Sequence, residues 1–397
     1  MVEISNLRKH PIMNGVGVRL EADIKFLDMD VKYPATSMYF DIRKDYAPMF
    51  STDTYDAFVL VGMYLAMYHH TDLRIRGNMS KKLYKNCTWY IQKILCDFSD
   101  VLRPAKIFVE GFAPTQAKGT LIGTGISCGV DSLSTIYDRF VRESDPDYRV
   151  NSLFIFNCGS HGDFGAPHTQ IVFKSRVERA IQVADELKLP AVVVDSNLHQ
   201  FRHDNDKDTV LFLSFYSCVL SMQAVIKRYY ISSGCSYSSI KDLGRDNSMH
   251  HDLATSCDSF LIPLIQTERI ELIIDGCQYR RVDKVRNMIN WEIAQKYLNV
   301  CLIQKGEDST NCGKCSKCLR TLLTIEILGK LDDFSKVFDI EAYKKESLAY
   351  KARSLENVDS EIFYKENVEL AKELNFPMPE RKPCYILNGN VVVINDK

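Results

Sequence analysis

The sequence lacks a strong net charge, a long apolar run and any internal repeat or low-complexity tract. Its 50 Lys and Arg residues nearly balance 51 Asp and Glu residues, which leaves a formal net charge of -1. No overall field therefore draws the protein to nucleic acid or to an anionic membrane, although a local basic groove stays open. Nowhere do about 18 uncharged apolar residues follow one another, so we predict no transmembrane helix and no membrane partner.

We also expect no secretory signal in the first residues. Residues 1–9 carry charges, and no apolar run of signal length follows them, so we expect a cytoplasmic protein. In that reducing compartment the 13 cysteines favour metal binding over disulfides, because three of them stand in one C-x-x-C-x-x-C run. We expect the nine cysteines outside the metal set to be mostly buried thiols.

The length and apolar content predict a large core. A chain of 397 residues that is 46% hydrophobic exceeds the usual size of one domain. Residues 1–50 alternate short apolar and charged stretches, which favours β-strands, and helical spacing follows over 56–69 and 80–98. With a strand at 106–110, these elements predict a small α+β domain over residues 1–117.

From about residue 120, apolar strands alternate with amphipathic helices. Strands are expected at 120–123, 152–156, 191–195, 230–233 and, as strand or short helix, 270–274; helices are expected at 131–141, 175–187 and 209–229. The alternation predicts an α/β fold with a doubly wound parallel sheet, whose ligands lie beyond the carboxyl ends of its strands. A helical extension over 331–397 ends in a predicted hairpin, where Asn388-Gly389 favours a type I′ turn.

The segment 127–132 lies between a predicted strand and a predicted helix. At such a position, successive backbone N–H groups and the helix N-terminus form an anion site that small residues leave open. We predict phosphate binding by Ser127, Cys128, Gly129, Val130, Asp131 and Ser132. Asp131 can hold a magnesium ion, or it can simply cap the helix in a turn that binds no ligand.

The same hexapeptide resembles the Ser-Gly-Gly-x-Asp-Ser loop of the PP-loop ATP pyrophosphatases, which belong to the adenine nucleotide α-hydrolase-like superfamily. Cys128 replaces the first family glycine, and a positive φ at that position would strain its backbone. The resemblance implies that ATP and Mg²⁺ are cofactors and that pyrophosphate leaves as an adenylate forms. A thiol at a helix N-terminus can also be nucleophilic, for instance as a sulfur carrier.

Four cysteines, Cys301, Cys312, Cys315 and Cys318, have the spacing C-x10-C-x2-C-x2-C. Thiolates two residues apart fold around one tetrahedral ion, and four sulfurs leave no open coordination position. We predict a structural Zn²⁺ ion that contributes folding energy; an iron–sulfur cluster and unliganded thiols are the alternatives. Together with the following Leu319-Arg320, this element resembles the zinc element of 7-cyano-7-deazaguanine synthase-like enzymes, a PP-loop family of the queuosine pathway.

The resemblance covers about residues 118–330, which we assign as the PP-loop domain. It implies that Phe156 and Asn157 lie near the adenine. It also implies that Arg281 and Lys284, three residues apart, share a helix face aimed at phosphates; a solvated face is the alternative. The expected catalytic residues are Asp131, Ser132, Arg281 and Lys284.

The activity that this resemblance implies is that of an AMP-forming ligase. It would adenylate a small-molecule or peptide acceptor and transfer nitrogen from ammonia or an amine, giving an amide or a nitrile. Two alternatives stay open: ATP-dependent sulfur insertion and a non-catalytic nucleotide-binding subunit. The protein can also assemble as a homodimer in this interpretation. A nucleic-acid acceptor is disfavoured by the neutral charge. His250 or His251, with Asp252, are candidates for a general base.

Overall fold

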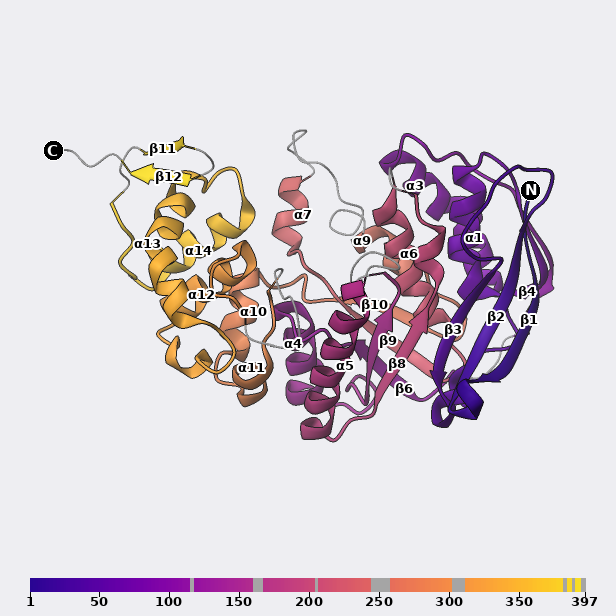
Figure 1. Cartoon of the computed structure of the whole chain (residues 1–397), viewed down its shortest axis with the longest axis horizontal. Helices are drawn as coiled ribbons and strands as arrows, with labels where there is room; N and C mark the ends of the chain where they lie inside the picture. Colours follow the sequence, from indigo (N-terminus) through magenta and orange to yellow (C-terminus); the bar gives the residue numbers. More distant parts are fainter. Residues whose placement is uncertain are drawn as a thin grey trace. The chain divides into compact units, whose positions relative to one another are not determined.

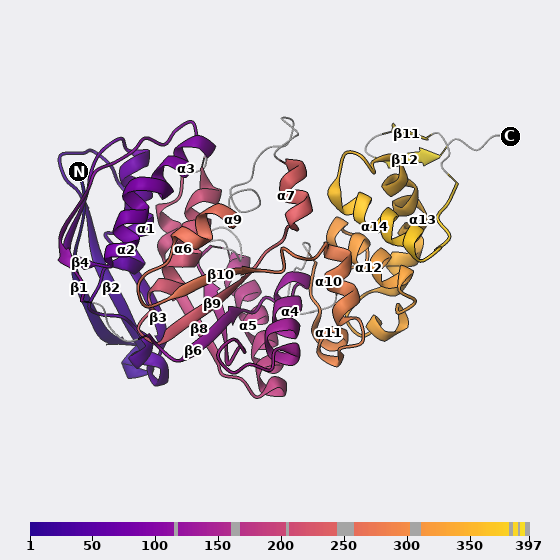
Figure 2. The same cartoon turned by 180° about the vertical axis from the view of Figure 1, so that it is seen from behind.

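The computed structural model describes residues 1–114, 118–159, 167–203, 206–243, 258–301, 311–380, 384–387 and 390–393. Figure 1 labels its elements, and Figure 2 shows them from behind. The chain forms two compact units, the first from Met1–Ile126, Asp138–Ser233 and Leu243–Asp275, and the second from Ser127–Tyr137, Gly234–Asp242 and Gly276–Lys397. The domain ranges 1–117, 118–330 and 331–397 stay predictions, because compactness alone does not test which segments fold independently.

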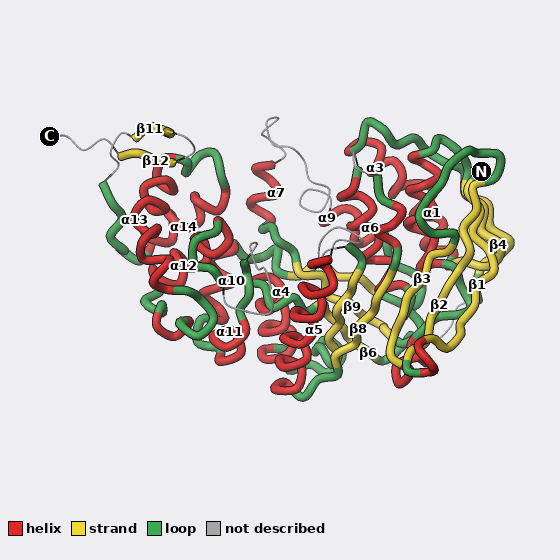
Figure 3. The backbone as a smooth tube through the Cα atoms, in the orientation of Figure 1, coloured by secondary structure: helices red, strands yellow, loops and turns green. Residues whose placement is uncertain are grey.

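The first unit is built on one 10-stranded sheet, drawn in yellow in Figure 3, with the order β10-β9-β6-β7-β8-β3-β2-β1-β4-β5. One part is parallel and contains β10 (Glu271–Asp275), β9 (Ile226–Ser232), β6 (Leu121–Gly125), β7 (Ser152–Asn157) and β8 (Ala191–Ser196). The antiparallel strands β3 (Ser37–Arg43), β2 (Gly17–Phe26) and β1 (Val2–Ile12) follow, and β4 (Leu73–Met79) and β5 (Ile107–Phe112) pair parallel beyond them. The pairing of β3 with β8 joins the two parts.

Burial along the strands follows their place in this sheet. Every residue of β7 is buried, which is typical of a central strand covered on both faces. In β3, buried Met38, Phe40 and Ile42 alternate with more exposed neighbours, as expected when one face packs on the core. Helix α1 (Asp56–Tyr68) is buried on all sides except at its end and contacts α6 (Lys207–Leu220).

One hydrophobic core crosses the whole sheet of the first unit. It contains residues of α1 and β1 as well as residues of β7, α6 and β9. The helix α5 (Pro167–Leu187) contacts β7 and β8. Further described helices of this unit include α2 (Lys81–Asn86), the π-helical Cys87–Ile91, α3 (Gln92–Phe98) and α9 (Asp258–Leu261). The prediction of a mixed α/β fold with a large, mostly parallel sheet is confirmed; its PP-loop type and a separate N-terminal domain stay predictions.

The second unit is mainly helical in its described residues. It contains α4 (Val130–Ile136), α7 (Tyr237–Leu243), α10 (Arg281–Met288), α11 (Glu292–Tyr297), α12 (Ser316–Ile327), α13 (Ile340–Glu356) and α14 (Ile362–Glu373). Helix α10 contacts α4, α12 and α14, and so lies at the centre of this group. None of the helices in the described ranges of the chain has both the length and the apolar character that a membrane span requires.

The chain's last paired strands are β11 (Cys384–Leu387) and β12 (Asn390–Val393). They pair antiparallel, with Leu387 opposite Asn390, so the predicted hairpin pairing is confirmed. The Asn388-Gly389 turn itself lies outside the described residues.

Candidate functional site

The segment Ser127–Ser132 forms a tight turn that enters α4. Cys128 has φ +59°, in the left-handed region that favours glycine, and its side chain is 1% exposed. Its carbonyl accepts the N–H of Asn299 at 2.7 Å, which helps to hold this backbone. Gly129 then adopts an extended conformation as the N-cap residue of α4. Cys128 therefore occupies the conformation that we identified as strained for a side chain, at a cost of order 1 kcal/mol.

The two serine hydroxyls of the turn contact its own backbone. Ser132 Oγ accepts the N–H of Ser127 at 3.3 Å and donates to the carbonyl of Gly129 at 3.2 Å. Ser127 Oγ accepts the N–H of Gly129 at 3.3 Å. These amide contacts are long for hydrogen bonds, so an anion that reached the two amides would displace only weak partners.

Asp131, in the first turn of α4, faces two cations from α10. Arg281 Nη1 lies 3.0 Å from Asp131 Oδ2, and Lys284 Nζ lies 2.9 Å from Asp131 Oδ1. Burial by itself raises the pKa of Asp131, but the charges of Arg281 and Lys284 outweigh it and lower that pKa below its ordinary value. The structure thus brings Asp131, Arg281 and Lys284 together; whether they bind phosphate stays a prediction.

A third cation, Arg320 on α12, acts on the same carboxylate through its charge. Its guanidinium carbon lies 3.9 Å from the centre of the Phe363 ring, and that of Arg281 lies 5.5 Å from the same ring. Among the described residues no hydrogen-bond acceptor meets the Nε atom of Arg320 or of Arg281. Burial, followed by the charge of Arg281, lowers the pKa of Arg320 to about 10.

Arg320 is the residue at this cluster that the sequence interpretation missed. In the sequence it follows the last cysteine, where its charge can be taken to offset that of the four thiolates, and nothing local indicates a phosphate. Its proximity to Asp131 depends on the contact of α10 with α12, which no local spacing reveals.

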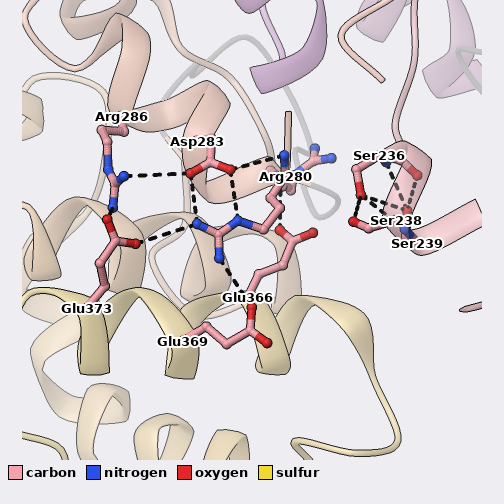
Figure 4. A network of polar contacts seen from close by, with 10 residues as sticks. Ser236, Ser238, Ser239, Arg280, Asp283, Arg286, Glu366, Glu369 and Glu373 are labelled. Atoms are coloured by element: carbon pink, nitrogen blue, oxygen red, sulfur yellow. Dashed lines mark hydrogen bonds and ion pairs between the residues drawn. The ribbon is translucent and has the colours of Figure 1, made fainter. Parts of the chain in front are cut away.

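Helix α14 fixes the N-terminus of α10. Glu366 accepts the backbone N–H of Arg281 at 2.8 Å, so an acidic side chain from another helix satisfies one free donor at this end. Arg280 adds contacts to Asp283 at 2.8 Å and to Glu369 at 3.2 Å. Figure 4 shows this network, in which Arg286 also pairs with Glu373. The glutamates come three or four residues apart, on one face of α14.

The four cysteine sulfurs at 301, 312, 315 and 318 lie within 4.8 Å of one another. Cys312 Sγ is 3.9 Å from Cys318 Sγ, close to the separation of about 3.8 Å that a tetrahedron with 2.3 Å zinc–sulfur bonds requires. Gly313 has φ +68°, and a Cβ atom there would lie 2.2 Å from the carbonyl oxygen of Asp339. The cluster can therefore hold a metal ion such as zinc, with four soft donors and no open position.

Asn311, which sequence reasoning also missed, holds the first cysteine near the other three. Its Oδ1 accepts the N–H groups of Val300 at 2.7 Å and Cys301 at 3.0 Å, and its Nδ2 donates to the carbonyls of Leu298 and Val337. The side chain is fully buried. The amide group of Asn311 thus links the backbone at 298–301 to the backbone at Val337.

Phe156 and Asn157 end β7 in the first unit. The Asn157 amide donates to Asp195 Oδ1 at 2.8 Å, and the Phe156 ring lies 5.2 Å from that of Phe215. Their predicted place near an adenine stays a prediction. The candidates His250, His251 and Asp252 lie outside the described residues.

Comparisons of the chain with models of protein families, with curated proteins and with solved structures found no match. The resemblance to PP-loop enzymes therefore depends on the residues themselves: the turn at Ser127–Ser132 and the four cysteines.

Proposed function

We propose that the second unit binds the phosphates of ATP and that the protein is an AMP-forming ligase. The observation that carries the proposal is the charge around Asp131, where Arg281, Lys284 and Arg320 act on one carboxylate. This surplus of positive charge lies next to a turn of small residues, so a polyphosphate would find both cations and backbone amides there.

Ligand binding would exchange partners within this cluster. Arg281 and Lys284 would turn from Asp131 to the phosphate oxygens, and Asp131 would become free to hold Mg²⁺. The magnesium ion, when bound, neutralises charge on the β- and γ-phosphates. Lys284 is 1% exposed, so its charge acts in a poorly hydrated place where it stabilises an anion more strongly than in water.

The proposed reaction has two displacements. A carboxylate oxygen of the acceptor bonds to the α-phosphorus as the bond from that phosphorus to pyrophosphate breaks. A nitrogen nucleophile then attacks the acyl carbon, loses a proton and releases AMP. Positioning of the triphosphate and neutralisation of its charge supply most of the catalysis that these residues can offer.

The four-cysteine site would act through structure alone. Zinc held by four thiolates keeps no position for substrate, so it stabilises the beginning of α12 and the turn at Gly313. The side chain of Cys128 is almost fully buried, which disfavours it as a sulfur carrier in the thiolation alternative.

The test is a substrate-pool incubation with ATP and Mg²⁺, read by mass spectrometry for AMP and pyrophosphate. We expect both products, and we expect Asp131→Ala to lower their formation by about 100-fold or more. The control variant Lys345→Ala removes an exposed lysine of the second unit and should match the wild type. Formation of ADP alone would refute the ligase, and ATP binding without turnover of any acceptor would favour the non-catalytic subunit.

A further inference from the structure

Among the described residues, Arg320 differs from the four cations at helix α10 in having no carboxylate partner of its own. Arg281 and Lys284 contact Asp131, while Arg280 and Arg286 contact acidic residues of α10 and α14. In the described part of the chain no ion pair joins Arg320 to a carboxylate, and its Nε lacks a hydrogen-bond partner. Leaving the buried Nε donor of Arg320 unsatisfied is costly, so this arrangement suits an anion supplied from outside.

The Arg320 side chain is nevertheless held in one place. Its guanidinium stacks on Phe363, and its backbone carbonyl accepts hydrogen bonds from Asn367 Nδ2 at 3.3 Å and Thr324 Oγ1 at 3.1 Å. Glu361 also faces Arg320 electrostatically, but no ion pair joins the two. Stacking on Phe363 therefore orients the guanidinium donors before any ligand arrives, which lowers the entropic cost of binding.

The four-cysteine site lies at the beginning of the helix that carries Arg320. Cys315 is the N-cap residue of α12, Cys318 lies in its first turn, and Arg320 follows two residues later. Because the four sulfurs must converge on one ion, metal binding fixes the first turn of α12 and with it the backbone that carries Arg320. Loss of the ion would leave this turn to fray, as helix ends without anchors do.

We propose that Arg320 is a third ligand of the phosphate group that Arg281 and Lys284 bind beside Asp131, and that the four-cysteine metal centre positions Arg320. Metal binding and polyphosphate binding are then coupled, so that each raises the affinity for the other by the same factor. This inference rests on the proposed phosphate site and adds to it one ligand and one form of regulation.

The first experiment measures the affinity of the zinc-loaded full-length chain for inorganic pyrophosphate and for ATP by calorimetry. Arg320→Ala should weaken both about 10- to 100-fold, the loss expected for a charge-assisted contact. Arg320→Lys should weaken them less, since it keeps the charge and loses the planar fork. Lys345→Ala should bind like the wild type. Unchanged affinity in Arg320→Ala would overturn the inference while leaving the phosphate site intact.

The second experiment measures zinc affinity at equilibrium against a competing chelator, with and without saturating pyrophosphate. Pyrophosphate should raise the zinc affinity of the wild type by the same factor that zinc raises pyrophosphate affinity, and it should do so much less in Arg320→Ala. Equal effects in the two proteins would mean that the coupling runs through folding of the unit, and this would overturn the role of Arg320. If the wild type binds neither pyrophosphate nor ATP, the proposed function itself fails.

Discussion

Two aspartates in the first turns of helices, one in each unit, have opposite surroundings. Asp56 begins α1 in the first unit, is fully buried, and accepts neutral donors: the N–H of Ser80 at 2.8 Å, Gln223 Nε2 at 2.7 Å and the Ser80 hydroxyl. Asp131 lies in the first turn of α4 in the second unit, keeps 23% of its side chain exposed, and pairs with the cations Arg281 and Lys284.

The difference separates a structural carboxyl group from a candidate functional one. Burial raises the pKa of Asp56 despite its hydrogen bonds, whereas nearby cations lower the pKa of Asp131 despite burial. Neutral donors such as an amide and a hydroxyl satisfy Asp56 completely and offer nothing to another anion. The cations around Asp131 can transfer to a ligand, so only the second environment can both hold the fold and bind phosphate.

The largest expected effect is on stability. Asp56→Ala leaves the buried Ser80 N–H and the Gln223 amide without an acceptor and should cost about 3 kcal/mol of unfolding free energy. Asp131→Ala removes a side chain that is 23% exposed, so water can take its place beside the cations, and the loss should be about half as large. Urea unfolding followed by circular dichroism gives both values. Equal losses would remove the distinction between the two aspartates.

Anion rescue gives an intermediate effect. Without Asp131, the cations Arg281 and Lys284 lose their carboxylate, so pyrophosphate should stabilise Asp131→Asn by about 1 kcal/mol more than it stabilises the wild type. Asp56→Asn serves as the matched control and should respond to pyrophosphate like the wild type. The unfolding midpoint measured at several pyrophosphate concentrations gives the comparison; an equal response of both variants would place the anion elsewhere.

The smallest effect is an opposite dependence on pH. The folded pKa of Asp131 lies below the unfolded value of about 3.9, so its stabilisation is present above that pH and is lost as pH falls through the folded pKa. The folded pKa of Asp56 is raised, so its contribution is complete below about pH 3.9 and is lost as pH rises through the folded pKa.

The two asparagine variants separate these contributions. Asp131→Asn should flatten the acid side of the stability curve, and Asp56→Asn should flatten the decline that begins above about pH 4. Urea unfolding between about pH 3 and 8 measures both curves. Parallel curves for the two variants would show that these carboxyl groups do not differ in their folded surroundings.

Sequence patterns predicted the strands β6, β7, β8 and β10 and the four-cysteine cluster because these signals are local. The predicted helix 209–229 was too long, since α6 ends at Leu220 and β9 begins at Ile226. Alternating apolar strands and helices need only neighbouring residues, and three of the cysteines lie within one short run. The continuity of the sheet could not be predicted in this way. It depends on β3 meeting β8 through Phe40 opposite Ser196 and Asp41 opposite Asp195, partners more than 150 residues apart in the chain.

The candidate site was also predicted only where its signals are local in the sequence. The turn at Ser127–Ser132 and the spacing of Arg281 and Lys284 were visible, but their meeting at Asp131 depends on α10 packing against α4. The sequence indicated that a left-handed backbone at Cys128 would be strained, but it did not predict that Cys128 adopts this backbone, which is rare for cysteine. Arg320 and Asn311 act through tertiary contacts that leave no periodic signal.

The discontinuous make-up of the second unit has a consequence during synthesis of the protein. Asp131 leaves the ribosome 150 residues before Arg281, and the four cysteines follow later still. The turn at Ser127–Ser132 therefore cannot contact its cationic neighbours until most of the chain has been synthesised. A nascent or truncated chain that ends before Cys318 would lack both the metal centre and the completed cluster around Asp131.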